Sequence, residues 1–144
     1  MLYELETLEA GHIADLALDA RKARDRLLEK IREVDLREPV PVRGERNPIG
    51  DLPLNGEIEA QPEFVTLRQA IAAMPRDIRV KVWGVMHTGR GDITIREWNE
   101  TISAASLLTD YEIAADLLED ADLHDHVRKG LYKVGVTRLP GDGH

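Results

Sequence analysis

The chain contains no cysteine among its 144 residues. This absence excludes disulfide bonds, thiolate nucleophiles, iron–sulfur clusters and zinc sites built on cysteine. Aromatic residues make up only 4% of the sequence, so the hydrophobic core has to consist mainly of leucine, isoleucine, valine and alanine. Such aliphatic, alanine-rich material suits the close packing of helices better than a β-sandwich.

Long hydrophobic runs and an excess of basic residues are also missing. No stretch approaches the roughly 18 apolar residues of a membrane-spanning helix, and the acidic first 30 residues contain no pattern of a secretory signal. The 19 Lys and Arg residues are outnumbered by 27 Asp and Glu residues, which gives a net charge of −8. Because cationic side chains dominate affinity for phosphates, this balance disfavours nucleic-acid binding. We therefore expect a cytoplasmic protein that binds neither membranes nor nucleic acids.

One long helix is expected near the N-terminus. From about residue 9 to residue 34, apolar residues recur at three- and four-residue steps, which is typical of a helix with one buried face. The residues of this face are Ile13, Ala17, Ala20, Leu27, Ile31 and Val34. Residues 36–61 then contain four prolines and three glycines, a density that disfavours regular structure. We interpret them as a Pro/Gly-rich linker, with a binding loop as the alternative.

Shorter helices are predicted in the second half of the chain. A helix from Pro62 to Met74 is followed, after Pro75, by one that a left-handed Gly89 could end. Two further helix starts are indicated by the spacing of capping boxes, in which a Thr is followed three residues later by a Glu. These boxes are Thr94 with Glu97 and Thr109 with Glu112, with a helix break near Leu108 between them.

The last helix is expected from about Ala121 to Val134, ended by Gly135 and followed by a frayed tail over residues 136–144. Residues 1–144 then form a single helical domain. The predicted fold class is all-α, a compact bundle of about five to six helices with a long N-terminal helix.

The residues around Gly89–Asp92 form a glycine-broken corner between two predicted helices. Aligned to a twelve-residue calcium loop with Met86 first, the segment places Gly91 at the turn position and Glu97 at the last ligand position. Met86 and Arg90 then occupy positions that need oxygen ligands, and Arg90 would repel a cation. A turn between helices is therefore favoured over a calcium site, and Asp92 and Glu97 remain its candidate metal ligands.

The same corner offers candidate ligand-binding residues, namely His87, Arg90 and Asp92. Arg90 next to His87 could meet a small anion, but pairing between Arg90 and Asp92 is favoured because exposed arginines usually find a local carboxylate. Trp83 and Trp98 flank the corner and are expected to pack together across it. If one of them is partly exposed, the pair would form an interaction surface.

Common catalytic motifs are absent. The sequence has no His-Glu-x-x-His, no Gly-x-Ser-x-Gly and no kinase signature. Asp120 and His124 are spaced to share a metal on a helix, but a solvated acidic helix start is favoured because metal sites need three or four converging ligands. We therefore predict no catalytic residues and no cofactor.

The segment from about Phe64 to Gly135 resembles an uncharacterised family of bacterial, mainly proteobacterial, proteins of unknown function. The resemblance rests on a helix with Trp83, the Gly89–Asp92 turn and a second helix with Trp98, and its core spans residues 62–135. The sequence departs from the family pattern at residues 87–88, where a bulkier apolar approach to the glycine is expected. The resemblance implies a helical fold and no particular activity.

These observations favour a non-enzymatic protein-interaction or regulatory module. Its long first helix or its Pro-rich loop would contact a protein partner or a second copy of the chain. The alternative is a protein that binds a small anion or a metal ion at the Gly89–Asp92 corner, used as a degenerate EF-hand-like loop. A concave pocket containing His87, Arg90 and Asp92 would favour this alternative.

Overall fold

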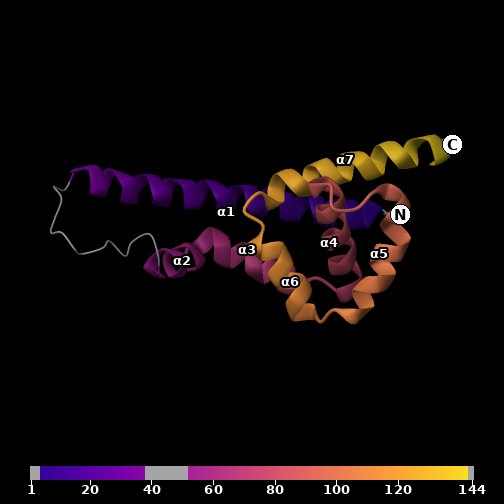
Figure 1. Ribbon diagram of the computed structural model, residues 1–144, viewed down its shortest axis with the longest axis horizontal. Helices are drawn as coiled ribbons and strands as arrows, with labels where there is room; N and C mark the ends of the chain where they lie inside the picture. Colours follow the sequence, from indigo (N-terminus) through magenta and orange to yellow (C-terminus); the bar gives the residue numbers. More distant parts are fainter. Residues whose placement is uncertain (1–3, 38–51, 143–144) are drawn as a thin grey trace.

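The computed structural model describes residues 4–37 and 52–142, and within these two ranges it contains helices and no strand. The predicted all-α class is therefore confirmed, although these ranges hold more helices than the five to six expected. The elements in chain order are α1 (Glu4–Arg37), α2 (Leu52–Glu59), α3 (Pro62–Ala73), α4 (Arg76–Arg90), the short 3₁₀ helix η2 (Ile95–Glu97), α5 (Trp98–Ala104), η3 (Ala105–Leu107), α6 (Asp110–Glu119) and α7 (Leu123–Asp142) (Figure 1). In the described part of the chain, no helix could cross a membrane.

The long N-terminal helix is confirmed, and α1 extends beyond both predicted ends. Its first half packs against α3, α4 and α7 through small and aliphatic side chains. The buried residues of α1 include Ala10, Ile13, Ala14, Ala17, Ala20 and Ala23. Figure 1 shows that the second half of α1 continues past the bundle of α4–α7. In that half, Leu28 is exposed while Leu27 and Ile31 are only partly buried.

The helix α4 lies at the centre of the bundle, in contact with α1, α5, α6 and α7. Its closest neighbour is α7, and glycine is needed on both sides of that contact. A Cβ atom added to Gly89 would lie 1.7 Å from the backbone oxygen of His126, and one added to Gly130 would lie 2.0 Å from that of Val85. The two backbones therefore touch directly, with no side chain between them.

The turn between α3 and α4 is held by a buried arginine. Nε of Arg79 donates to the backbone oxygen of Ile71 at 3.1 Å, and its Nη2 donates to those of Ala72 and Met74 at 3.1 and 2.6 Å. These carbonyls lie at or just after the end of α3, where the last carbonyls of a helix lack N–H partners within the helix. Arg79 thus replaces a C-terminal cap and fixes the direction in which α4 begins.

The corner after α4 differs from the prediction, because α4 continues past Gly89 to Arg90. The left-handed residue is Gly91, with φ of 88°, and its N–H and that of Asp92 bond to carbonyls of the last helical turn. Gly89 is instead a helical residue selected by the contact with α7. Met86 also lies inside α4, so the twelve-residue calcium-loop alignment has no loop to correspond to.

Both capping boxes are confirmed. The backbone N–H of Thr94 donates to Glu97 at 2.8 Å, and the equivalent bond from Thr109 to Glu112 is also 2.8 Å. In the second box the Thr109 hydroxyl accepts from the N–H of Glu112 at 3.0 Å. These bonds satisfy donors that the helix starts would otherwise leave unpaired.

Two other boundary predictions are corrected. Part of the predicted 36–61 loop is helical: residues 36–37 end α1 and residues 52–59 form α2, while residues 38–51 lie outside the described residues. Pro53 is tolerated in α2 because it lies in the first turn, where its missing N–H has no partner to lose. Gly135 does not end α7, whose backbone remains helical to Asp142. A single glycine costs a helix only about 1 kcal/mol, so it does not by itself end one.

Candidate functional site

A polar network joins the end of α4 to α6, and His87 is at its centre. Nδ1 of His87 lies 2.7 Å from Oδ2 of Asp92, and Nε2 lies 2.8 Å from Oδ2 of Asp116. Both ring nitrogens thus lie within hydrogen-bond distance of a carboxylate oxygen. The ring therefore ties the glycine corner to α6.

Asp116 receives a second donor from α4. The indole N–H of Trp83 donates to Oδ2 of Asp116 at 2.8 Å, and the Trp83 ring stands edge-on to the His87 ring with centroids 4.8 Å apart. Partial burial raises the pKa of Asp116, but the hydrogen bonds from His87 and Trp83 outweigh burial and hold that pKa below its ordinary value of 3.8. Asp116 is thus a carboxylate whose charge the network stabilises.

Arg90 is paired at the corner, as the favoured interpretation had it. Its Nε lies 3.2 Å from Oδ2 of Asp92, the same oxygen that His87 contacts. The two terminal amino groups of Arg90 have no hydrogen-bond partner within residues 4–37 and 52–142. Arg90 is therefore oriented by Asp92 while its amino groups stay available.

Arg90 borders a polar hollow of about 290 Å³ between the ends of α4 and α6 and the start of α7. Its lining residues are Arg90, Asp116, Glu119, Asp120, Ala121 and His126. Of the three predicted ligand-binding residues, Arg90 alone is among them. His87 and Asp92 lie behind it and hold Asp116 and Arg90 in place.

The hollow also contains His126, which was not among the predicted ligand-binding residues. Nδ1 of His126 lies 2.6 Å from Oδ2 of Asp120, whose side chain is only 8% exposed. The other carboxylate oxygen of Asp120 accepts from the backbone N–H of Asp122 at 3.0 Å. This fixes the His126 ring, and its Nε2 has no partner in the described ranges. The spacing Asp120-x₅-His126 across a helix start was the available signal, but it is common by chance.

The predicted metal ligands do not converge. Asp92 contacts His87 and Arg90, while Glu97 caps the next helix through Thr94. Asp120 pairs with His126 rather than His124. The described residues contain no group of three or more His, Asp or Glu side chains that could hold a metal ion.

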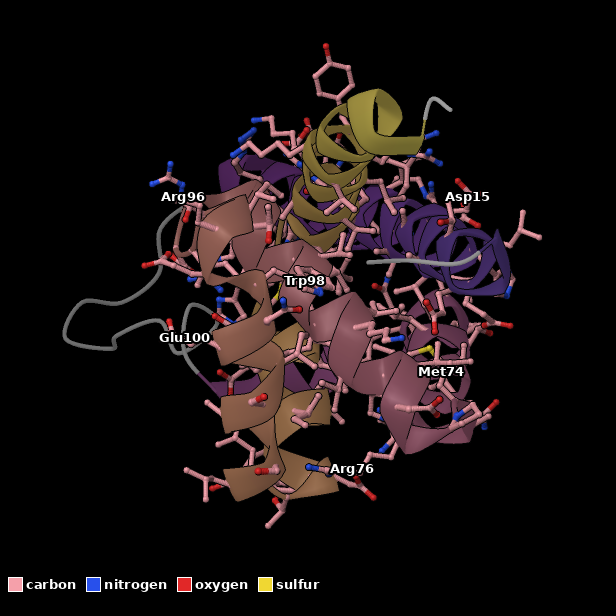
Figure 2. All side chains as sticks on the ribbon, turned by 90° about the vertical axis from the view of Figure 1, so that its right-hand side faces the viewer. Asp15, Met74, Arg76, Arg96, Trp98 and Glu100 are labelled. Carbon is pink, nitrogen blue, oxygen red and sulfur yellow. The ribbon has the colours of Figure 1, made fainter. Side chains whose placement is uncertain are left out.

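The two tryptophans are buried and do not form the predicted pair. Trp83 is 9% exposed and contacts the His87–Asp116 network, whereas Trp98 is 3% exposed and packs over Gly84. Figure 2 shows Trp98 in the interior, with Arg96 and Glu100 at the edge. The interaction surface predicted at these indoles is therefore not exposed.

An apolar groove of about 590 Å³ lies elsewhere, where α3 packs against both α1 and α6. One face of α1 forms a side of it, through Ala17, Ala20, Arg21 and Arg24. The remaining lining comes mainly from α3 and α6 and includes Phe64, Leu67, Arg68, Tyr111, Ala114, Ala115 and Leu118. Three arginines (Arg21, Arg24, Arg68) and three carboxylates (Glu59, Glu119, Asp120) also line the groove, so it is mainly apolar with charged residues of both signs.

Comparison with known proteins places the chain in a family. The family model described as "Protein of unknown function (DUF3775)" matches residues 65–136, which is half of the chain and agrees with the predicted core of resemblance. The match contains the glycine corner, the polar hollow and the α6 side of the groove. No curated protein and no solved structure matches the chain. The chain therefore belongs to the DUF3775 family, a family of unknown function.

Proposed function

We propose that this protein is a non-enzymatic interaction module that binds an α-helix in the groove between α1 and α6. The observation that carries the proposal is the groove itself, about 590 Å³ in volume and apolar at its base. Ala17 and Ala20 on α1 and Ala115 on α6 contribute small side chains to the lining. Small side chains allow a bound helix to approach the backbones of α1 and α6 closely. Insertion of an amphipathic helix into such a groove is a recurring mode of recognition.

The rim indicates the chemistry of the bound helix. Arg21 is paired with Asp122 at 2.8 Å, but Arg68 forms no ion pair with any described residue and lies 5.9 Å from the Phe64 ring centroid. Tyr111 is 79% exposed at the same rim. Exposed tyrosine and arginine are the residue types that most often dominate binding energy at interfaces. Because the groove is lined by both arginines and carboxylates, the expected occupant carries large aliphatic side chains on one face and charged residues of both signs beside them.

The test uses a fluorescent synthetic helix of leucine, glutamate, lysine and alanine, with leucines at the spacing of one helical face. Its binding to the full chain is followed by fluorescence anisotropy. Ala115→Glu places a carboxylate inside the groove and is expected to weaken binding by at least about tenfold, or about 1.4 kcal/mol. The matched control is Ala104→Glu, at an exposed position on α5 outside the groove, which should bind like the wild type. Absence of binding, or equal binding by both variants, contradicts the proposal.

A second candidate function is the binding of a small anion in the polar hollow. The specific observation is that Arg90 and His126 line the same hollow, and that the amino groups of Arg90 and Nε2 of His126 have no hydrogen-bond partner in the described ranges. The carboxylates of Asp116 and Asp120 already accept hydrogen bonds from protein donors. All three carboxylates of the lining oppose an anion, and Glu119 is the one without a hydrogen bond from a described residue, so its replacement by Gln should strengthen anion binding.

Inorganic phosphate is the probe for this second function. Phosphate should raise the melting temperature of the wild type and of the control Arg96→Gln, whose side chain is exposed away from the hollow. The same addition should leave Arg90→Gln unchanged. An equal rise in all three proteins, or none in the wild type, refutes a specific anion site at Arg90.

A further inference from the structure

We infer that the polar hollow binds a small zwitterion with the chemistry of a free amino acid. This inference rests on the second candidate function, the anion site at Arg90, and names the class of its ligand. Arg90 on α4 receives the carboxylate of the ligand, while Glu119 on α6 and His126 on α7 receive its ammonium group.

Arg90 supplies the donors for the carboxylate of the ligand. Its Nε lies 3.2 Å from Oδ2 of Asp92, and the same oxygen lies 2.7 Å from Nδ1 of His87. Asp92 therefore holds the guanidinium through Nε, while the two amino groups have no hydrogen-bond partner in the described ranges. A planar guanidinium with two free amino groups matches the two oxygens of a carboxylate.

Glu119 is the carboxylate that remains for an ammonium group. The lining holds three carboxylates, and two of them, Asp116 and Asp120, already accept hydrogen bonds from protein donors. Glu119 forms no hydrogen bond or ion pair with any described residue. Because the three carboxylates outnumber Arg90 and His126, a purely anionic ligand is opposed by the lining, whereas an ammonium group is attracted by it.

His126 adds an acceptor to the same hollow. Its Nδ1 lies 2.6 Å from Oδ2 of Asp120, whose side chain is 8% exposed and whose other oxygen accepts from the backbone N–H of Asp122. In the neutral ring, this carboxylate favours the tautomer with its proton on Nδ1, which leaves Nε2 as an acceptor. An ammonium group only donates hydrogen bonds, so Nε2 of His126 and the carboxylate of Glu119 are both complementary to it.

The size of the hollow favours a small molecule. Its volume of about 290 Å³ lies just below the roughly 300–1,000 Å³ of sites that enclose drug-sized ligands. Ala121 is the one residue of its lining without a polar side chain. The hollow therefore suits a ligand made mostly of a carboxylate and an ammonium group, and it offers little apolar surface to a large side chain.

The experiment is an NMR titration of the full chain, followed through the backbone amide of Ala121 in the lining of the hollow. The probes are L-alanine and β-alanine, which differ in the position of the ammonium group, and propionate, which lacks that group. At least one of the two amino acids should give saturable shifts and bind about threefold more tightly than propionate. Absence of saturable shifts with both amino acids overturns the inference.

Replacement of Glu119 by Gln should give changes of opposite sign for the two kinds of probe. Glu119→Gln should weaken binding of the amino acid about threefold and strengthen binding of propionate, because its carboxylate attracts the ammonium group and repels a lone anion. Arg90→Gln should weaken binding of both. The matched control is Glu100→Gln, at an exposed position on α5 outside the hollow, which should bind every probe like the wild type. Far-UV circular dichroism checks that each variant is folded.

The outcomes separate this inference from the function on which it rests. Binding of phosphate or propionate that depends on Arg90, without binding of either amino acid, keeps the anion site and overturns the zwitterion as its ligand. Amino acid binding that is unchanged in Glu119→Gln, or equally weakened in Glu100→Gln, also overturns the inference. Absence of binding by every probe overturns both.

Discussion

Replacement of Gly89 by alanine tests the backbone contact at the centre of the bundle. The added Cβ would lie 1.7 Å from the backbone oxygen of His126 and 2.8 Å from the backbone nitrogen of Gly130. Because both atoms belong to the backbone of α7, no change of side-chain rotamer can make room, and the two helices must separate. Overpacking of a core costs roughly 1–3 kcal/mol even where side chains can adjust, whereas alanine gains about 1 kcal/mol in helix propensity. Because only the backbone can move here, the cost lies at the top of that range, about 3 kcal/mol, and we expect a net loss of about 2 kcal/mol.

Urea denaturation and thermal melting of the two proteins measure this loss. A loss of this size corresponds to a melting temperature lower by roughly 6–8 °C. Gly11→Ala is the control, because Gly11 is also inside a helix but an added Cβ meets nothing within 4 Å. That variant should be more stable than the wild type by about 0.5–1 kcal/mol. If Gly89→Ala is instead as stable as the wild type, the result contradicts the direct backbone contact between α4 and α7.

Two further predictions concern buried polar groups. Arg79→Met removes the donors of three carbonyls at the end of α3 and should cost about 3 kcal/mol in urea denaturation. Arg79→Lys should restore only part of this, because an ammonium cannot reproduce the planar set of donors, and full restoration would contradict the capping role. Asp116 has a folded-state pKa below 3.8, so its contribution to stability is complete above that pH and is lost as pH falls through the lower folded-state pKa. The difference in unfolding free energy between the wild type and Asp116→Asn should therefore shrink in acid, and a difference that stays constant with pH would refute the stabilised charge.

Local signals in the sequence predicted the local structure well. The boxes at Thr94 and Thr109 are complete within three residues, so the bonds that start those helices could be read directly from the sequence. The apolar period of α1 was sufficient for the same reason. The αL position was missed because Gly89 and Gly91 are equally able to adopt it, and only contact with α7 decides that Gly89 is helical.

The candidate sites were predicted less completely, because they depend on contacts between distant residues. The pairing of Arg90 with Asp92 is local and was expected. The contact of His87 with Asp116 joins α4 to α6, and no spacing of residues in the sequence indicates it. The same holds for the cap that Arg79 provides, since nothing in the sequence distinguishes it from Arg76. The groove also escaped prediction, because its lining comes from five helices.

The direct contact of Gly89 with Gly130 has a consequence for how the chain reaches its native state. It joins backbone segments of α4 and α7, between which two other α-helices lie in the chain. Until α7 is in place, the sides of α4 and α1 that it covers remain in water. During synthesis on the ribosome, α7 is the last of the described helices to emerge. We therefore expect the bundle to complete its folding in one late step, and its precursors to be the states most open to proteolysis and aggregation.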